Sequence, residues 1–493
     1  MKFCLSAIFL FFVLQSLPLS RSEGGEDDAP STVCIVGSGI GGSSVAHFLR
    51  AYSVSGVLVG AQILMFERHG VVGGRMATVT VTGDTFEAGA SILHPKNYHA
   101  RNFTEKFNLK IRSPSSSSDD SSVGIWNGRG FIFKTLRASF KSPLLNWIVS
   151  LLNDLSIFAR YGFSLFRMND FTENAVGNFL KYYKNPETRP IFETVEEMLK
   201  WSGLYNLTRR TLQEELSEAQ LSPLLANELI TVITRINYGQ SLLISGLAGA
   251  VSMAGSSGGL WAVEGGNWKM AAELINHSDV TLHLNERIES ISYLGEYYEL
   301  NSTKGGSYKC DVAVVATPLD EVDIQFLPSI SIPKRELQHT HATFVRGILN
   351  PGYFGLKSVL DIPNLVGTIE DPEIPFSSIS VLKKHGDNDT TYKIFSRQPM
   401  SEALLDDLFR IREETIRIDW AAYPKYHAPE VFAPFILDGN HLYYVNAFEN
   451  GASTMETSAV AAENVARLIL SRFLTKGSSS GTRSCSSGLH SDI

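Results

Sequence analysis

The chain has 493 residues, of which 44% are hydrophobic and 19% are charged, and its formal net charge is −8. This length allows a large buried core and predicts more than one domain. The acidic balance excludes the basic face that a nucleic-acid partner requires. The composition is ordinary for a globular protein and does not identify a substrate.

The N-terminus has the pattern of a signal peptide. Lys2 precedes an apolar run over residues 3–14, and Ser20-Arg-Ser22 offers small residues for cleavage. The run is too short to span a bilayer, so residues 1–22 are predicted to be removed. No later stretch predicts a transmembrane segment. The chain is therefore expected in the secretory pathway.

Five N-x-S/T sequons follow this segment and predict a glycoprotein; they lie at Asn102, Asn206, Asn276, Asn301 and Asn388. Three cysteines remain after the signal peptide: Cys34, Cys310 and Cys485. Their spacing is not that of a disulfide framework, and a core of this size does not need one. No spacing typical of metal ligands occurs, so no metal site is predicted.

A nucleotide-binding motif begins at the first predicted strand, residues 33–36. The strand runs into Gly37-x-Gly39-x-x-Gly42, and a helical pattern follows. Gly37 allows the tight turn, Gly39 lets the backbone approach a pyrophosphate, and Gly42 lets the helix pack against the sheet. The free amides at the start of the helix favour the phosphates. This context predicts a Rossmann-type domain.

A second apolar strand over residues 62–67 ends in Glu67, whose carboxylate suits the ribose hydroxyls of a dinucleotide. The alternative is that Glu67 lies at a surface strand end. Arg68, Gly73-Gly74-Arg75 and residues 86–90 come next. They resemble the second glycine motif of the flavoprotein oxidases, a superfamily that includes the amine oxidases.

That resemblance implies FAD as the cofactor. Arg68, Gly74 and Arg75 are expected to bind it, the last two along its phosphates. Gly89 and Ala90 are expected to pass close to the flavin ring. The alternative for Arg75 is an ordinary surface arginine, and the preceding Rossmann motif disfavours it.

The C-terminal region predicts one more cofactor element. A strand from Leu442 and a glycine turn at Gly451 precede an alanine-rich helix that begins at Met455. Its N-terminus, with Glu456 in the first turn, is expected to point at the flavin and stabilise negative charge there. The alternative is a helix that only docks on the domain.

The expected fold is α/β, with a Rossmann-type, amine oxidase-like FAD-binding domain and a discontinuous α+β substrate domain. The FAD-binding domain is assigned to residues 31–112, 237–320 and 429–472. The substrate domain is assigned to residues 113–236 and 321–428. It is expected to contain a hairpin at 124–133 and a helix from Ser401 to about Ile416. Residues 473–493 are predicted to form a disordered tail.

Residues 144–166 carry a dense apolar stripe at helical spacing. Such a stripe usually faces a core, and this is the expected role. Two alternatives are the wall of an apolar substrate channel and a helix that rests on a membrane surface, which would make a peripheral membrane contact.

Two further segments, Asn237-Tyr-Gly-Gln-Ser241 and Leu260-Trp-Ala-Val-Glu-Gly-Gly-Asn267, are similar to the prenylcysteine oxidase family. The resemblance implies a noncovalent FAD, a farnesyl- or geranylgeranyl-cysteine substrate, and oxygen as the acceptor. It also implies a prenyl aldehyde, cysteine and hydrogen peroxide as products, and a lysosomal or vacuolar setting. His94 and Tyr238 lie in matching segments, but the sequence assigns neither a catalytic role.

Two other readings use the same motifs. One is an amine oxidase-like or desaturase-like flavoprotein with another substrate, and the other is a secreted, non-catalytic lipid-binding glycoprotein. The Asn237 and Trp261 segments disfavour the first, and the intact glycines disfavour the second. The sequence predicts no particular oligomeric state.

Overall fold

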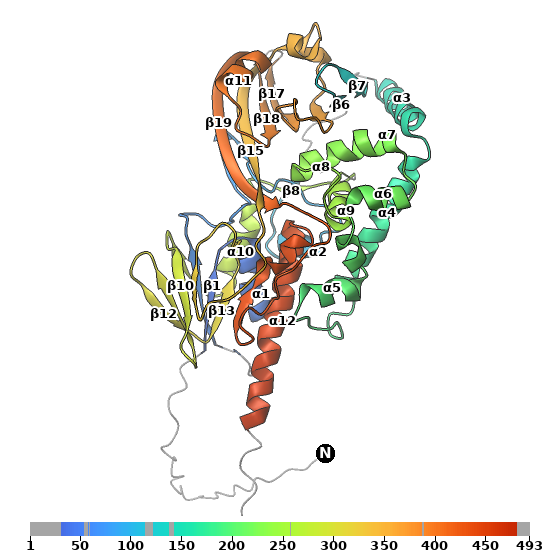
Figure 1. Ribbon diagram of the computed structural model, residues 1–493. Helices are drawn as coiled ribbons and strands as arrows, with labels where there is room; N and C mark the ends of the chain where they lie inside the picture. Colours follow the sequence, from blue (N-terminus) through green and yellow to red (C-terminus); the bar gives the residue numbers. More distant parts are fainter. Residues whose placement is uncertain are drawn as a thin grey trace, which may run out of the picture.

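The computed structural model describes residues 31–53, 58, 60–113, 122–137, 142–256, 258–386 and 389–480. The predicted signal peptide, Asn388 and Cys485 lie outside these residues. Figure 1 shows two sheet-containing regions, with a group of helices along one side of both.

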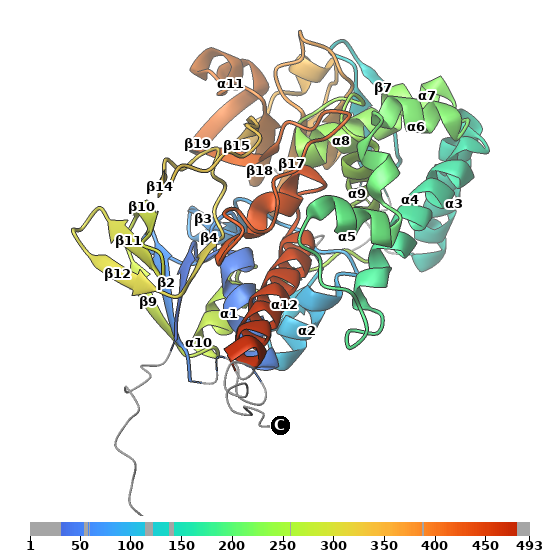
Figure 2. The same cartoon turned by 60° about the horizontal axis from the view of Figure 1, so that its bottom comes forward.

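A five-stranded parallel sheet forms the first region, in the order β20-β13-β1-β2-β9. Its strands are β20 (Leu442–Tyr444), β13 (Val312–Val315), β1 (Thr32–Val36), β2 (Gln62–Glu67) and β9 (Val280–Leu284). The runs Val-Cys-Ile-Val and Val-Ala-Val-Val of β1 and β13 are buried, as apolar strands covered on both faces must be. Helices α1 (Ile40–Tyr52), α10 (Trp268–Asn276) and α12 (Met455–Ser480) pack together beside it (Figure 2). The predicted Rossmann-type arrangement is present.

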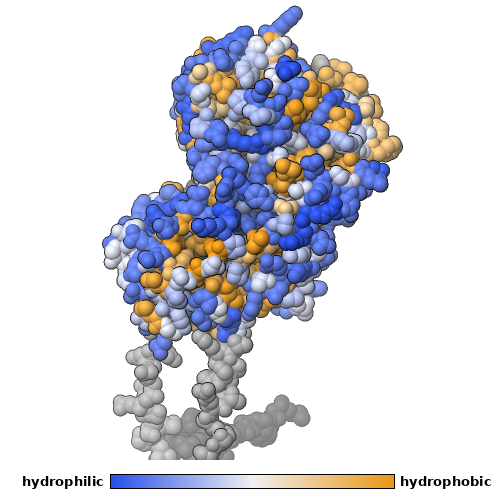
Figure 3. Space-filling model, viewed as in Figure 1, coloured by the Kyte–Doolittle hydropathy of each residue, from blue (hydrophilic) through white to orange (hydrophobic). Residues whose placement is uncertain are grey.

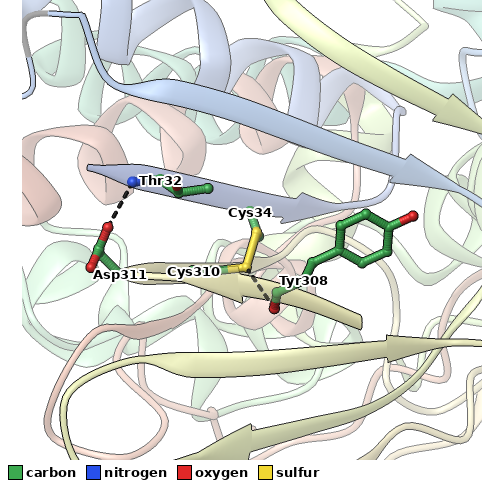
Figure 4. The surroundings of a disulfide bond; sticks show 5 residues. All are labelled: Thr32, Cys34, Tyr308, Cys310 and Asp311. Atoms are coloured by element: carbon green, nitrogen blue, oxygen red, sulfur yellow. Dashed lines mark hydrogen bonds between the residues drawn. A yellow bond between two sulfur atoms is a disulfide. The ribbon is translucent and has the colours of Figure 1, made fainter. Parts of the chain in front are cut away.

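A four-stranded sheet adjoins it, in the order β12-β11-β10-β14, from β12 (Ser307–Cys310), β11 (Tyr298–Ser302), β10 (Ile288–Tyr293) and β14 (Gln325–Leu327). A disulfide joins Cys34 in β1 to Cys310 at the end of β12, with the two Cα atoms 5.8 Å apart (Figure 4). The expectation that the cysteines form no disulfide is therefore wrong. Because β13 pairs with β1, the chain entering β13 passes Cys34, and a sequence separation of 276 residues hides this proximity.

A seven-stranded sheet forms the second region, in the order β19-β15-β18-β17-β16-β6-β7. Its strands are β19 (Phe409–Pro424), β15 (Leu337–Leu349), β18 (Asp389–Ser396), β17 (Ser378–Gly386), β16 (Leu365–Thr368), β6 (Val123–Trp126) and β7 (Phe131–Lys134). The antiparallel pair β6 and β7 confirms the predicted hairpin. The helix expected over residues 401–416 is wrong beyond α11 (Glu402–Leu408), since Phe409 begins the long strand β19.

Helices line one side of both regions (Figures 1 and 2). They are α3 (Pro143–Tyr161), α4 (Ser164–Phe179), α5 (Val195–Ser202), α6 (Leu212–Glu218), α7 (Pro223–Leu225), α8 (Thr231–Tyr238) and α9 (Gly246–Ala254). Met253 of α9 shares a core cluster with Leu212 and Leu216, so α9 packs with these helices although residues 237–320 were assigned to the FAD-binding domain.

The remaining elements connect these layers: β3 (Thr78–Val81), β4 (Asp84–Glu87), α2 (Tyr98–Lys106), β5 (Ile111–Arg112) and β8 (Ala262–Val263). Two features differ from expectation. Helix α12 continues to Ser480, past residue 473 where a disordered tail was expected to begin. The apolar stripe of α3 faces solvent, so its expected role in a core is wrong.

Candidate active site

One cavity of about 1370 Å³ joins the glycine motifs to the helices and the seven-stranded sheet. Its wall contains residues 37–41, Glu67 and residues 73–76 of the glycine motifs. It also contains the apolar residues Val123, Ala175, Val176, Phe179 and Leu180. The cavity therefore combines a polar, glycine-lined part with an apolar part.

The glycines of the first motif are required by close backbone contacts. Gly37 has a φ of +108°, and a Cβ there would lie 2.6 Å from the carbonyl oxygen of Ala316. A Cβ on Gly42 would lie 2.0 Å from the carbonyl oxygen of Gly37. These two residues hold α1 against the sheet, as predicted from the motif.

Gly39 has a different environment. A Cβ there would meet only Gly73 and Gly74, each 3.8 Å away. Gly39 and Gly73 form a β-bridge, and Gly73 donates a backbone hydrogen bond to Ser38 (3.1 Å). The two glycine motifs, separated in sequence, thus form one concave surface at the N-terminus of α1, and this surface suits a pyrophosphate.

Glu67 is buried at the end of β2 and lines the same part of the cavity. Its Oε2 accepts hydrogen bonds from the backbone N–H and the hydroxyl of Ser38 (3.1 and 2.6 Å), and its Oε1 accepts one from His69 N–H (2.9 Å). Arg68 is exposed beside it, and its Nε donates to Nε2 of His69 (3.0 Å). Both residues were expected to bind the dinucleotide, and both line the cavity.

Arg75 lies at the cavity wall in an ion-pair network. Its guanidinium donates to the carbonyl of Ala422 (2.7 Å) and to the buried carboxylate of Glu449. Burial alone raises the pKa of Glu449, but the positive charges of Arg75 and Arg335 lower it below its ordinary value. Arg75 therefore ties the second glycine motif to the segment that precedes α12.

Lys393 is a cavity residue that sequence reasoning missed. Its Nζ donates to the carbonyl of Glu87 and to the hydroxyl of Ser91, both at 3.1 Å, on either side of Gly89 and Ala90. Burial lowers the pKa of Lys393 to about 8, and burial raises the pKa of the Glu87 carboxyl to about 7. The available signal was one lysine inside the strand pattern Thr-Tyr-Lys-Ile-Phe.

A glycine is also required at position 89, because a Cβ there would lie 2.0 Å from the carbonyl oxygen of Arg75. Ala90 lies next to it in the wall, and its carbonyl accepts a hydrogen bond from the side chain of Asn267 (2.9 Å). The second glycine motif and the Asn267 segment therefore support each other at the predicted ring position.

Glu456 is buried at the start of α12 and also lines the cavity. Its carboxylate accepts backbone hydrogen bonds from His99 (2.7 Å) and Ala100 (3.0 Å), so it caps the first turn of α2. Thr454 caps α12, because its hydroxyl accepts from the Thr457 N–H (3.0 Å) and its carbonyl from the Ser458 N–H (3.1 Å), which leaves the N–H groups that precede them. What α12 offers to a cofactor is thus its backbone and dipole.

The two distinguishing segments of the sequence have structural roles beside the cavity. The side chain of Asn237 donates to the carbonyl of Ser252 (2.9 Å), and Nε1 of Trp261 donates to the carbonyl of His94 (3.1 Å). Burial lowers the pKa of His94. Tyr238 donates its hydroxyl to the carbonyl of Ser453 (3.2 Å). These contacts join segments of the cavity wall to one another.

The residues present fit FAD. The surface opposite Gly39 is open only because no Cβ fills it, Glu67 offers a buried acceptor, and the first turn of α12 faces the same cavity. The open surface at Gly39 suits a pyrophosphate, the Glu67 carboxylate suits a ribose, and the first turn of α12 suits the electron-rich edge of a flavin.

Comparison with known proteins places the chain in a family. The family described as "Prenylcysteine lyase" matches residues 145–481, and "NAD(P)-binding Rossmann-like domain" matches residues 35–107. The chain is 73% identical over 493 residues to farnesylcysteine lyase of Arabidopsis thaliana, covering 99% of each chain. This chain belongs to the prenylcysteine lyase family. Prenylcysteine oxidase 1 of Homo sapiens, 34% identical over 484 residues, covers 92% of this chain and 91% of its own.

Solved structures support the fold of this prenylcysteine lyase family member. A putrescine oxidase matches with a TM-score of 0.57 at 14% identity, and cyclohexylamine oxidase from Brevibacterium oxydans matches with 0.56 at 17%. Each match covers 90% of this chain and 99% of the other. The amine oxidase-like fold predicted from the sequence is confirmed.

Proposed function

We propose that this protein is an FAD-dependent thioether oxidase in the degradation of prenylated proteins. It cleaves farnesylcysteine and geranylgeranylcysteine to the prenyl aldehyde, free cysteine and hydrogen peroxide. The supporting observation is the continuous cavity that joins the expected dinucleotide-binding surface to an apolar chamber. The names of the relatives, farnesylcysteine lyase and prenylcysteine oxidase 1, identify the same substrate class.

The chemistry supplied by bound FAD is acceptance of a hydride from C1 of the prenyl group and return of the electrons to oxygen. C1 is allylic and bonded to sulfur, so the resulting cation is stabilised; water then adds and the hemithioacetal collapses to aldehyde and thiol. The apolar walls bind the prenyl chain at about 0.8 kcal/mol per buried CH₂ and orient C1. Lys393 contributes a titratable amine in the wall beside Gly89.

The test uses the purified, yellow holoenzyme without added nicotinamide. Farnesylcysteine is expected to yield farnesal and peroxide one for one, and deuterium at C1 is expected to slow flavin reduction in stopped-flow measurements. A short S-alkyl cysteine should be a very poor substrate. Formation of farnesol or farnesene instead of the aldehyde would mean hydrolysis or elimination and would refute the proposal.

We also propose that the protein is a glycoprotein that enters the secretory pathway and acts in a lysosome or vacuole. The predicted signal peptide and the disulfide between Cys34 and Cys310 support this route. Asn102, Asn206 and Asn276 are exposed, whereas Asn301 lies within β11 and its amide donates to Ser290 (3.3 Å). Treatment of the protein from its native host with an endoglycosidase should lower its mass; an unchanged mass would contradict the proposed glycosylation.

A further inference from the structure

Helix α3 is amphipathic, but its apolar face points away from the protein core. Its large apolar side chains face solvent: Leu144, Leu145, Trp147, Ile148, Leu151, Leu152, Leu155 and Phe158 are all exposed, and Trp147 is 62% exposed. A helix that packs on a globular core normally turns such side chains inward. In α3, the apolar face is available to something outside the chain.

Polar contacts on the inner face hold the helix in this orientation. The side chain of Asn153 accepts from the N–H of Leu136 (2.7 Å) and donates to its carbonyl (3.0 Å). Arg160 forms two hydrogen bonds of 2.7 Å to Glu228, which also accepts from the Tyr161 hydroxyl (3.0 Å). Rotating α3 to bury its apolar side chains would break these contacts, so the exposure is a feature of the fold.

The apolar face continues into the turn that follows. Phe163 and Phe166 are exposed, and their rings lie 5.6 and 6.3 Å from that of Phe158. We call these two residues and the eight exposed residues of α3 the α3 surface. Figure 3 shows hydrophobic residues gathered at the edge of the molecule where Figure 1 places α3. A contiguous patch of this kind marks an interaction site.

The charges near the α3 surface indicate a neutral partner. Residues 143–166 contain one acidic and one basic side chain, Asp154 and Arg160, and Arg160 is paired with Glu228. Arg137 and Arg167, which flank this segment, donate to the carbonyls of Ile362 and Gln220. Residues 143–166 therefore have no net formal charge, whereas the two flanking arginines keep theirs, because a neutral carbonyl does not cancel a positive charge. The helix face itself suits a neutral partner.

The elements on both sides of α3 are walls of the cavity. Helix α4 begins next to Phe163 and carries Ala175, Val176 and Phe179 into the apolar part of the cavity. The β6–β7 hairpin, which precedes α3, contributes Val123. The α3 surface is thus connected to the chamber proposed for the prenyl chain through α4 and the β6–β7 hairpin.

We propose that the α3 surface docks the enzyme on the face of a neutral phospholipid bilayer. An interfacial helix of this type lies in the plane of the membrane, with its apolar side chains at the boundary between headgroups and acyl chains. Choosing a bilayer over a second copy of the chain rests on the proposed function, since a prenylcysteine partitions into membranes. No helix among the described residues is long and apolar enough to cross a bilayer, so α3 is proposed to lie on the surface.

The test is flotation of the holoenzyme with phosphatidylcholine vesicles, which requires no substrate. The variant carries Trp147→Gln, Leu151→Gln and Phe158→Gln. The matched control carries Leu294→Gln, Leu360→Gln and Ile411→Gln, which replace exposed apolar residues on other elements. Wild type and control are expected to float equally, at low salt and in 0.5 M NaCl, and the variant at least tenfold less. All three should keep their FAD and melting temperature.

Absence of flotation by the wild type, or equal flotation by the variant, would overturn the proposal. So would a wild-type dimer that does not float and that the variant converts to a monomer, because the α3 surface would then be an interface between copies. An enzyme that floats as expected but does not oxidise farnesylcysteine would refute the proposed function and leave membrane docking standing.

Discussion

Ser38 donates both its backbone N–H and its hydroxyl to the same oxygen, Oε2, of Glu67. This pair of hydrogen bonds fastens the loop between β1 and α1 to the end of β2, the two places where the dinucleotide is expected to bind. The loop and the acid are thus held in position before a ribose arrives. Because the loop is already ordered, FAD binding does not carry the free-energy cost of ordering it.

Glu67→Gln is expected to weaken FAD binding by about 1–3 kcal/mol, the usual cost of losing a charged hydrogen-bond partner. The amide nitrogen cannot accept, so either Ser38 or His69 loses its acceptor. The measurement is quenching of flavin fluorescence on titration into the apoprotein. Glu296→Gln, at an exposed site, is the control. Equal affinities of the Glu67 variant and the wild type would remove Glu67 from the cofactor site.

Gly39→Ala is expected to abolish stoichiometric FAD and leave the fold intact. The new methyl group would contact protein atoms only at 3.8 Å, in ordinary van der Waals range, but it would occupy the space of the pyrophosphate. Absorbance at the flavin bands per mole of protein and circular dichroism provide the two readouts. Gly130→Ala, which faces open space in the β6–β7 hairpin, is the control. A yellow Gly39→Ala protein would contradict this placement.

Gly42→Ala separates the packing role from the binding role. Its Cβ would lie 2.0 Å from the Gly37 carbonyl, so α1 must move away from the sheet. We expect the free energy of unfolding of the apoprotein to fall by about 1–3 kcal/mol. Chemical denaturation of the apoprotein measures it. Unchanged stability would show that α1 moves freely and that Gly42 is not needed for packing.

Replacing Cys34 and Cys310 together by alanine is expected to cost about 2–4 kcal/mol of stability, because the long loop they close becomes free in the unfolded chain. Thermal unfolding with and without dithiothreitol measures the effect. The reductant should lower the melting temperature of the wild type toward that of the variant and leave the variant unchanged. The disulfide is not formed if dithiothreitol leaves the melting temperature of the wild type unchanged and the wild type has two more alkylatable thiols than the variant.

Glu430→Gln is expected to stabilise the protein more at pH 8 than at pH 5. Burial raises the pKa of Glu430 to about 8, against the opposing effects of the His427 N–H and Arg335. Because the pKa of Glu430 is raised in the folded state, this carboxyl stabilises the fold fully below pH 4.5. The stabilisation is lost as the pH rises through 8. Glutamine does not titrate, so the advantage of the variant grows over that window.

Other groups complicate the pH profile of a single protein, so the comparison is between variant and wild type. Glu87, with a pKa raised to about 7 by burial, changes stability in the same direction as Glu430. His47, with a pKa lowered to about 4 by burial, acts oppositely, because its contribution is lost as the pH falls below 6.5. Melting temperatures from pH 5 to 8 give the difference. A constant difference between variant and wild type would contradict the raised pKa of Glu430.

Features governed by local backbone chemistry were predictable from the sequence. The turn at Gly37, the close packing at Gly42 and the acid at the end of β2 follow from neighbouring residues alone. The tight contact at Gly89 was predictable only by resemblance, because its partner is the carbonyl of Arg75, on the other side of the β3–β4 hairpin.

Features governed by tertiary contacts were not predictable. Lys393 reaches the cavity because β18 lies against the Glu87–Ser91 segment, and no local pattern predicts that. The stretch after Leu408 was assigned to a helix, although the Arg-Ile-Arg and Ile-Arg-Ile alternation of β19 has a period of two and is stabilised by its long pairing with β15. The stripe of α3 was assigned to a core because periodicity does not show which side of a helix faces the protein.

The interleaved order of the strands in the five-stranded sheet constrains how the chain matures on the ribosome. β1 emerges first, yet one of its two neighbours, β13, is made nearly 300 residues later, and the edge strand β20 and α12 come after that. Throughout this interval the Cys34 thiol has no partner, since Cys310 is 276 residues away. The nascent chain therefore holds an unfinished nucleotide-binding sheet until translation is nearly over. A chain that stops before residue 442 lacks both β20 and α12, so it can complete neither the edge of this sheet nor the helix expected at the flavin.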